Sequence, residues 1–116
     1  MISDFTRNAI QQLVNHELEY SKNQHEERFH SLHEAESVIR EELEELEEYT
    51  KSGRNVFNDI HTILRGRVEE GVELKSCALA IMAVAENVAM EAVQLSAMGK
   101  KLLEWDRHEK AKKAAE

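Results

Sequence analysis

The sequence predicts an all-helical protein. It has no proline and only 4 glycines among 116 residues, and apolar residues recur at helical spacing along most of the chain. Proline and glycine are the residues that most disfavour a helix interior, so their scarcity favours long helices joined by short turns. We expect a four-helix bundle formed as one domain over residues 1–108, followed by a frayed tail at 109–116.

Two serine-based caps mark the first two predicted helices. Ser3 and Asp4 can cap a helix that reaches about residue 29. Ser31 and Glu34 have the spacing of a capping box, in which each side chain accepts a backbone N–H of the other residue. A second, strongly amphipathic helix therefore begins there, and the segment 50–53, which ends in glycine, is predicted to end it.

The remaining sequence predicts a short helix and a long one. Apolar residues at helical spacing indicate a third helix from about 56 to 68, and Gly66 and Gly71 mark a bend. From about residue 72 the pattern predicts one long helix. Alanines lie on nearly every side of its 77–99 segment, which favours packing against several neighbours. Because a chain this short leaves much of its surface exposed, we expect a homo-oligomer, a dimer or a tetramer.

The acidic charge balance excludes whole classes of partner. With 23 Asp and Glu against 15 Lys and Arg, the net charge is −8. Nucleic acids and anionic membrane surfaces are bound by basic faces, so we expect neither as a partner. A phosphate-bearing ligand would need a cation between itself and this protein.

Nothing in the sequence predicts export or membrane insertion. The N-terminus lacks the basic start and apolar stretch of a signal peptide. The most apolar region, 77–99, contains Glu86 and Glu91 and makes a poor transmembrane span. The single cysteine, Cys77, lies among apolar residues and is interpreted as a small hydrophobe. We expect a cytoplasmic protein.

Glu42 interrupts the apolar face of the second predicted helix. At about 100° per residue, Glu41, Glu44 and Glu48 point away from the apolar arc, whereas Glu42 projects within it and Glu45 lies at its border. A buried carboxylate costs several kcal/mol unless a cation or hydrogen-bond donors compensate it. Glu42 is therefore expected to have a partner.

The long helix repeats this arrangement. Glu91 falls on its apolar arc, with Asn87 and Gln94 one turn before and after it. Carboxylate and amide oxygens that converge from two helices are hard ligands, typical of Mg²⁺ or Mn²⁺ sites. The alternative is structural, with the glutamates paired to a base such as Arg40, Arg65 or Lys100 or placed at a wet helix interface.

Two segments carry a resemblance to a known family: His33-Glu-Ala-Glu-Ser-Val-Ile-Arg-Glu-Glu-Leu-Glu-Glu-Leu46 and Met90-Glu-Ala-Val-Gln-Leu-Ser-Ala-Met98. Together they resemble the MazG-like nucleotide pyrophosphohydrolases, above all the short versions of phages and mobile elements. The resemblance covers about residues 30–103. It implies an all-α oligomer that hydrolyses nucleoside triphosphates to monophosphates and pyrophosphate with Mg²⁺.

The resemblance also implies roles for particular residues. The family's metal-binding pattern maps onto Glu42, Glu45, Glu91 and Gln94, with Gln94 in place of the usual aspartate. Glu41 or Glu45 would accept a proton from the attacking water. A further set would contact the substrate: His33, Asn87, Lys100 and Lys101.

Two other functions fit the same sequence. The chain could be a non-catalytic helical interaction module of a phage or mobile element, with structural ion pairs at its inward acids. It could also be a regulator that binds a nucleotide without hydrolysing it. Metal-dependent stabilisation and product formation distinguish these from the hydrolase.

Overall fold

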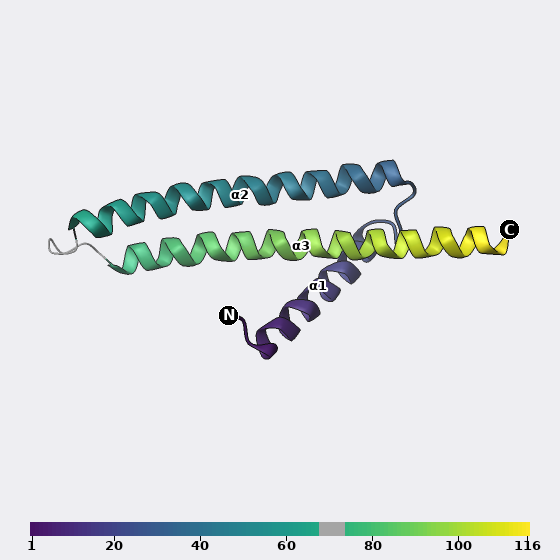
Figure 1. Cartoon of the computed structure of the whole chain (residues 1–116), viewed down its shortest axis with the longest axis horizontal. Coiled ribbons are helices and arrows are strands. Elements are labelled where there is room, and N and C mark those ends of the chain that lie inside the picture. The colour runs from purple at the N-terminus through teal and green to yellow at the C-terminus, as the bar shows by residue number, and fades with distance from the viewer. Residues whose placement is uncertain (68–73) are drawn as a thin grey trace. The chain divides into compact units, whose positions relative to one another are not determined.

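The chain is all-helical over the residues that the computed structural model describes, 1–67 and 74–116. These residues form three helices and no strand: α1 (Asp4–Gln24), α2 (Leu32–Arg67) and α3 (Leu74–Ala115) (Figure 1). The predicted all-α class is therefore confirmed. The bend expected near Gly66 and Gly71 falls largely on residues 68–73, outside the described residues.

Both predicted helix starts are confirmed by their caps. The Thr6 backbone N–H donates to the Ser3 side-chain oxygen over 3.1 Å, and α1 begins at Asp4. The Glu34 backbone N–H donates to the Ser31 side-chain oxygen over 3.1 Å, and α2 begins at Leu32. A serine cap accepts a backbone N–H that the first helical turn leaves without a partner. Because the two residues are only three apart, the helix start can be predicted from the local sequence.

The first helix ends earlier than predicted. It stops at Gln24 rather than near residue 29, and the N–H of His25 closes its last turn on the Ser21 carbonyl over 2.9 Å. Phe29, in the connection to α2, is only 4% exposed. Burial of this aromatic ring favours an irregular connection, because apolar area removed from water stabilises the fold in proportion to its size.

The predicted stop at residues 50–53 is wrong. The helix α2 continues through Gly53 to Arg67, so the second and third predicted helices are one. The glycine serves a tertiary contact: a Cβ at position 53 would lie 2.6 Å from the Cγ1 atom of Val84 in α3. Gly53 thus allows α2 and α3 to approach closely, and this contact is invisible to a local reading of the sequence.

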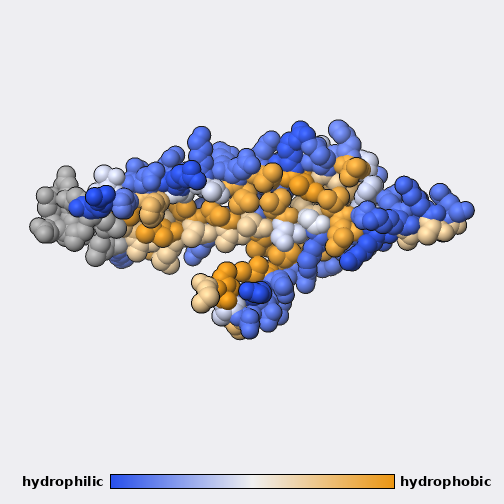
Figure 2. Space-filling model, in the orientation of Figure 1, coloured by the Kyte–Doolittle hydropathy of each residue, from blue (hydrophilic) through white to orange (hydrophobic). Residues whose placement is uncertain are grey.

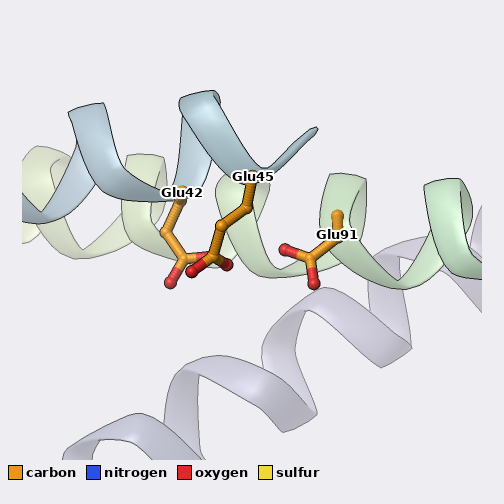
Figure 3. A group of neighbouring side chains, drawn as sticks. All are labelled: Glu42, Glu45 and Glu91. Atoms are coloured by element: carbon orange, nitrogen blue, oxygen red, sulfur yellow. The ribbon is translucent and has the colours of Figure 1, made fainter. Parts of the chain in front are cut away.

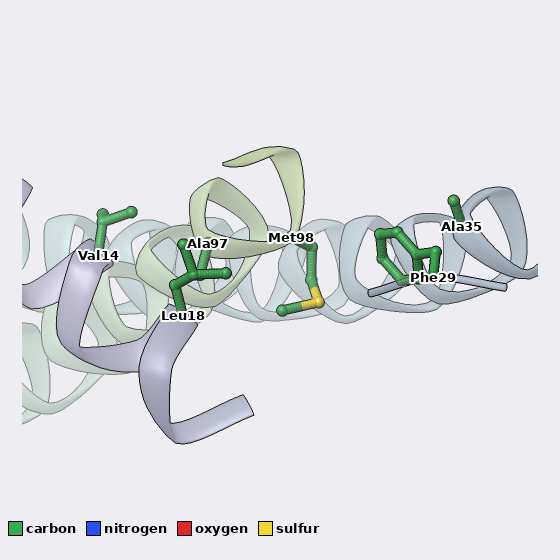
Figure 4. Close-up of a cluster of buried hydrophobic side chains, with 6 residues drawn as sticks. All are labelled: Val14, Leu18, Phe29, Ala35, Ala97 and Met98. Carbon is green, nitrogen blue, oxygen red and sulfur yellow. The ribbon is translucent and has the colours of Figure 1, made fainter. Parts of the chain in front are cut away.

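The contacts divide the chain into two units. The first unit contains Met1–Leu43 and Ala92–Glu116, and the second contains Glu44–Glu91. In the first unit, α1, the start of α2 and the later part of α3 share one apolar core, which contains Val14, Leu18, Phe29, Ala35, Ala97 and Met98 (Figure 4). Trp105 packs against this core and is partly buried.

Polar contacts also join α1 to α3 within the first unit. The Lys22 ammonium lies 2.9 Å from one Glu104 carboxylate oxygen and donates to the other over 3.2 Å. Lys100 donates to the side-chain oxygen of Asn15. Since each pair links residues more than 80 positions apart in sequence, these contacts hold the first helix against the last.

The second unit is a pair of helical segments, and its described residues bury little apolar surface. Ile60 is buried there, and the rings of Phe57 and His61 stack at 5.9 Å between centroids. Large apolar side chains remain exposed: Tyr49, Phe57, Leu79, Ile81, Met82 and Met90. Figure 2 shows such side chains open at the surface along α3.

By length and composition alone, α3 also contains a stretch that could cross a membrane, and none of that stretch is buried. A single helix of this kind is weak evidence for a membrane span, because the core helix of a water-soluble protein, which is mostly buried, passes the same test.

Candidate metal centre

The glutamates of α2 divide into inward and outward sets as helical geometry predicts. Glu42 and Glu45 are half-buried, whereas Glu41, Glu44 and Glu48 are exposed. Residues three apart on a helix lie on the same face, one turn from each other. The side chains of Glu42 and Glu45 therefore leave α2 in nearly the same direction, and Figure 3 shows their carboxylates next to each other.

Glu91 of α3 completes a cluster of three carboxylates. One oxygen from each of Glu42, Glu45 and Glu91 lies within 4.8 Å of the other two, and the Glu91 side chain points toward the pair from α2 (Figure 3). Glu45 and Glu91 belong to the same unit, and Glu42 precedes Glu45 by one turn of uninterrupted helix.

The electrostatics of this cluster disfavour the charged form of Glu91. The pKa of Glu91 is raised, first by its burial and then by the charge of Glu45 and the hydrogen bond between them. The Oε2 atom of Glu91 is buried and has no hydrogen-bond partner among the described residues. Proximity of like charges and loss of water both disfavour the ionised form, so a cation or a shared proton would relieve the site.

For Glu45 and Glu91, basic side chains of the described residues do not supply that cation. Within the described part of the chain, no lysine or arginine forms an ion pair with Glu45 or Glu91. Two of the bases considered from sequence are engaged elsewhere: Arg40 pairs with Glu36, and Lys100 bonds to Asn15. The structure thus gives no support to these two bases as partners of Glu91.

The donor set fits a hard divalent cation. Two oxygens bound to one Mg²⁺ at about 2.1 Å lie at most about 4.2 Å apart. The 4.8 Å spread of the three carboxylates is close to this limit, and a small rotation about the flexible glutamate side chains would close the difference. Carboxylate oxygens without sulfur or imidazole favour Mg²⁺ or Mn²⁺ over zinc.

The other predicted site residues have different surroundings. Gln94 and Glu41 are exposed at the edge of a cavity in the first unit, and Lys101 is buried beside the same cavity. His33 and Asn87 are exposed. Lys100 is partly buried and bonded to Asn15. The structure brings Glu42, Glu45 and Glu91 together, and the roles of the remaining residues stay predictions.

The cavity in the first unit has a volume of about 910 Å³. All of its lining residues belong to that unit: Glu17, Tyr20, Ser21, Gln24, His25, Glu26, Phe29, Glu34, Val38, Glu41, Glu42, Gln94, Ala97, Met98 and Lys101. Ligand sites typically measure about 300–1,000 Å³, so this one has room for a ligand of nucleotide size. Glu42 contributes to both the cavity and the carboxylate cluster.

Sequence analysis did not identify the polar contribution of α1 to this cavity. Glu17, Ser21 and Gln24 all line it, and their spacing of four and three places them on one face of α1. This polar stripe is the feature of the sequence that could have predicted a cavity lining. A solvent-exposed helix face carries the same kind of stripe, so the two cannot be distinguished from sequence.

Comparison of the chain with protein-family models, with curated proteins and with solved structures finds no match.

Proposed function

We propose that this protein is a divalent-metal-dependent nucleoside triphosphate pyrophosphohydrolase, which converts a ribo- or deoxyribonucleoside triphosphate to the monophosphate and pyrophosphate. The observation that carries the proposal is the convergence of Glu42, Glu45 and Glu91 from two helices within 4.8 Å. The resemblance of the two glutamate-containing segments to MazG-like enzymes supplies the reaction. The biological role of this reaction would be to remove non-standard or excess nucleotides.

The charge of the protein supports a metal-dependent reaction. A chain with a net charge of −8 repels a free triphosphate, and the cavity next to Glu42 carries further carboxylates. Substrate would therefore bind as a complex with Mg²⁺ or Mn²⁺, with Glu42, Glu45 and Glu91 as ligands and Gln94 as a further oxygen donor. When bound, the ion neutralises phosphate charge and lowers the pKa of a coordinated water.

The protein's own residues would position the substrate and accept a proton. Attack of water at phosphorus breaks one phosphoanhydride bond, and the water's proton passes to Glu41 or Glu45. Glu45 already interacts with Glu91, so a carboxylate of this pair can take up a proton without a large rearrangement. His33, Asn87, Lys100 and Lys101 are the predicted substrate contacts.

We also propose that the protein works as a homo-oligomer. The second unit exposes Phe57, Leu79 and Ile81 together with two methionines, Met82 and Met90, and such surface favours association. Pairing of this unit with that of a second copy would give a four-helix bundle. Light scattering should give a mass of two or four chains, whereas a monomer that partitions into lipid vesicles would favour a membrane role for α3.

The test of the enzymatic proposal is release of pyrophosphate from a panel of ribo- and deoxyribonucleoside triphosphates with Mg²⁺ or Mn²⁺. Wild type should release pyrophosphate from at least one substrate and only with metal. Glu42→Gln and Glu91→Gln should each lower the rate at least about 100-fold, comparable to the loss of a catalytic charge contact. Glu48→Gln is the matched control, because Glu48 is an exposed glutamate of the same helix.

The outcomes separate the candidate functions. Release that needs metal and both glutamates supports the hydrolase. Metal-dependent binding of a nucleotide without any product would identify a regulator. Absence of both release and metal binding, in protein that circular dichroism shows to be folded, would reject the proposal in favour of an interaction module.

A further inference from the structure

Lys101 is a charged residue in an apolar position. It lies on α3 between the core residue Met98 and the partly buried Trp105 and is only 4% exposed. It is also one of the residues that line the cavity of the first unit. Lysine is almost never this buried unless its ammonium is paired.

The surroundings of Lys101 do not supply that pairing. Its ammonium lies over the Phe29 ring, 4.9 Å from the centroid, and it has no hydrogen bond or ion pair among the described residues. Burial lowers the pKa of Lys101, an effect that the nearby Glu34, Glu104 and Glu26 partly oppose and Lys22 adds to. The cation–π contact offsets only part of the cost of taking a lysine side chain out of water.

The cavity places Lys101 away from the metal ligands. Gln94 and Lys101 are seven residues apart on α3, so about 10 Å separates them along the helix axis. Gln94 therefore lines the cavity about two helical turns before Lys101, and the Phe29 ring lies against the Lys101 ammonium. A ligand that spans the cavity would meet carboxylate and amide oxygens at one end, and an aromatic ring with a hydrogen-bond donor at the other.

We propose that the Lys101 end of this cavity binds the base of the nucleotide and that the Lys101 ammonium donates a hydrogen bond to a carbonyl oxygen of that base. This proposal rests on the proposed function and deepens it, because it names the substrate class. It also gives Lys101 a different role from the phosphate contact considered from sequence. The phosphates would lie toward Glu42 and Gln94.

The hydrogen-bonding groups of lysine determine which bases the proposed site prefers. An ammonium has three donors and no acceptor, so it favours the carbonyl oxygens of a base, which accept hydrogen bonds more strongly than the ring nitrogens do. Uracil, thymine, cytosine, guanine and hypoxanthine carry such an oxygen, whereas adenine carries none. Glu26 and Glu34, which also line the cavity, can accept N–H groups of the same bases. We expect triphosphates of carbonyl-bearing bases to be substrates and adenosine triphosphate to be the poorest one.

Binding of nucleosides without phosphate or metal tests this proposal directly. Inosine and adenosine differ in the group at C6, a carbonyl in one and an amino group in the other. Isothermal titration of the full chain in EDTA should show inosine and uridine binding at least about tenfold more tightly than adenosine, which matches one hydrogen bond to a charged group. Equal affinities for inosine and adenosine, or no binding of any nucleoside at millimolar concentration, would overturn the proposal.

Substitution of Lys101 is the second test of the proposed base site. Lys101→Met keeps the length of the side chain and removes the donor, so the preference for inosine should disappear. The melting temperature of this variant should equal or exceed that of wild type, because the desolvation of a charged group is removed; a purely structural lysine would instead lower it. Lys110→Met is the charge-matched control, because Lys110 is exposed and pairs with Asp106, one turn away on the same helix. Lys101→Gln serves as a second variant if the methionine variant does not fold.

The outcomes of these experiments distinguish the base-site proposal from the enzymatic proposal. Nucleoside binding with the expected preference but no hydrolysis would retain the base site and reject the hydrolase. Hydrolysis that is indifferent to the base, or a preference that survives Lys101→Met, would reject the base site and retain the hydrolase.

Discussion

Gly53 of α2 lies so close to Val84 of α3 that a Cβ atom added at position 53 would stand 2.6 Å from the valine Cγ1 atom. Real Cβ contacts essentially never fall below 3.0 Å, and the β-branched valine has little rotamer freedom with which to move away. The glycine therefore determines how closely the two segments of the second unit can pack.

Gly53→Ala should destabilise the protein for this reason. Overpacking of this kind typically costs about 1–3 kcal/mol, more than the gain of about 1 kcal/mol from replacing glycine in a helix. Gly99→Ala is the matched control, because a Cβ at position 99 meets nothing within 4 Å. Thermal unfolding should show a lower melting temperature for Gly53→Ala and a higher one for Gly99→Ala; an increase for both would contradict the close approach.

The same glycine shows why part of the fold could not be predicted from sequence. The caps at Ser3 and Ser31 were predictable, since a serine side chain bonds to an amide only three residues away. At Gly53 the local sequence predicts a helix stop, whereas the glycine is needed for its contact with Val84, a residue 31 positions later in the sequence. A local pattern cannot report a contact between two helices.

The candidate site divides in the same way. The inward direction of Glu42 and Glu45 follows from the helical period, and both are half-buried. The burial of Lys101 depends on Phe29, which lies in the connection after α1 and folds back onto α3. The lining contributed by Glu17 and Ser21 depends on where α1 packs. The burial of Lys101 and the cavity lining from α1 depend on packing between segments far apart in sequence, which the local sequence pattern does not predict.

The pair Lys22–Glu104 should contribute measurably to the stability of the first unit. The two side chains are 16% and 37% exposed, and their charged atoms lie 2.9 Å apart. The hydrogen bond to Glu104 is the largest cause of the raised pKa of Lys22. A double-mutant cycle with Lys22→Met and Glu104→Gln should give a coupling of about 0.5–1 kcal/mol that shrinks at high salt. A coupling of zero at low salt would show that this ion pair does not join α1 to α3.

Glu91 should make the metal-free protein less stable as the pH rises. Its folded-state pKa lies above the ordinary value of 4.5, so between those two values the folded chain binds more protons than the unfolded chain. The free energy of unfolding contributed by this group therefore falls with increasing pH in that interval. Relative to wild type in EDTA, Glu91→Gln should be more stable at pH 7, and the difference should decrease as the pH is lowered to about 4.

The control for this pH series is Glu48→Gln, whose exposed side chain should leave the pH profile of the melting temperature nearly unchanged. A Glu91→Gln variant that is less stable than wild type at pH 7 would mean that the carboxylate is held by favourable partners, against the electrostatics described above.

The measurement that tests the central claim most directly is calorimetric titration of metal-free protein with Mn²⁺ at pH 7, combined with thermal unfolding at a saturating concentration. Wild type should bind the ion and gain about 2.7 kcal/mol of stability at 100 times the dissociation constant. Glu42→Gln and Glu91→Gln should both lose the binding and the gain, and Glu48→Gln should keep them. Equal metal binding by wild type and Glu91→Gln, or none by wild type, would contradict the assignment of Glu42, Glu45 and Glu91 as a metal centre.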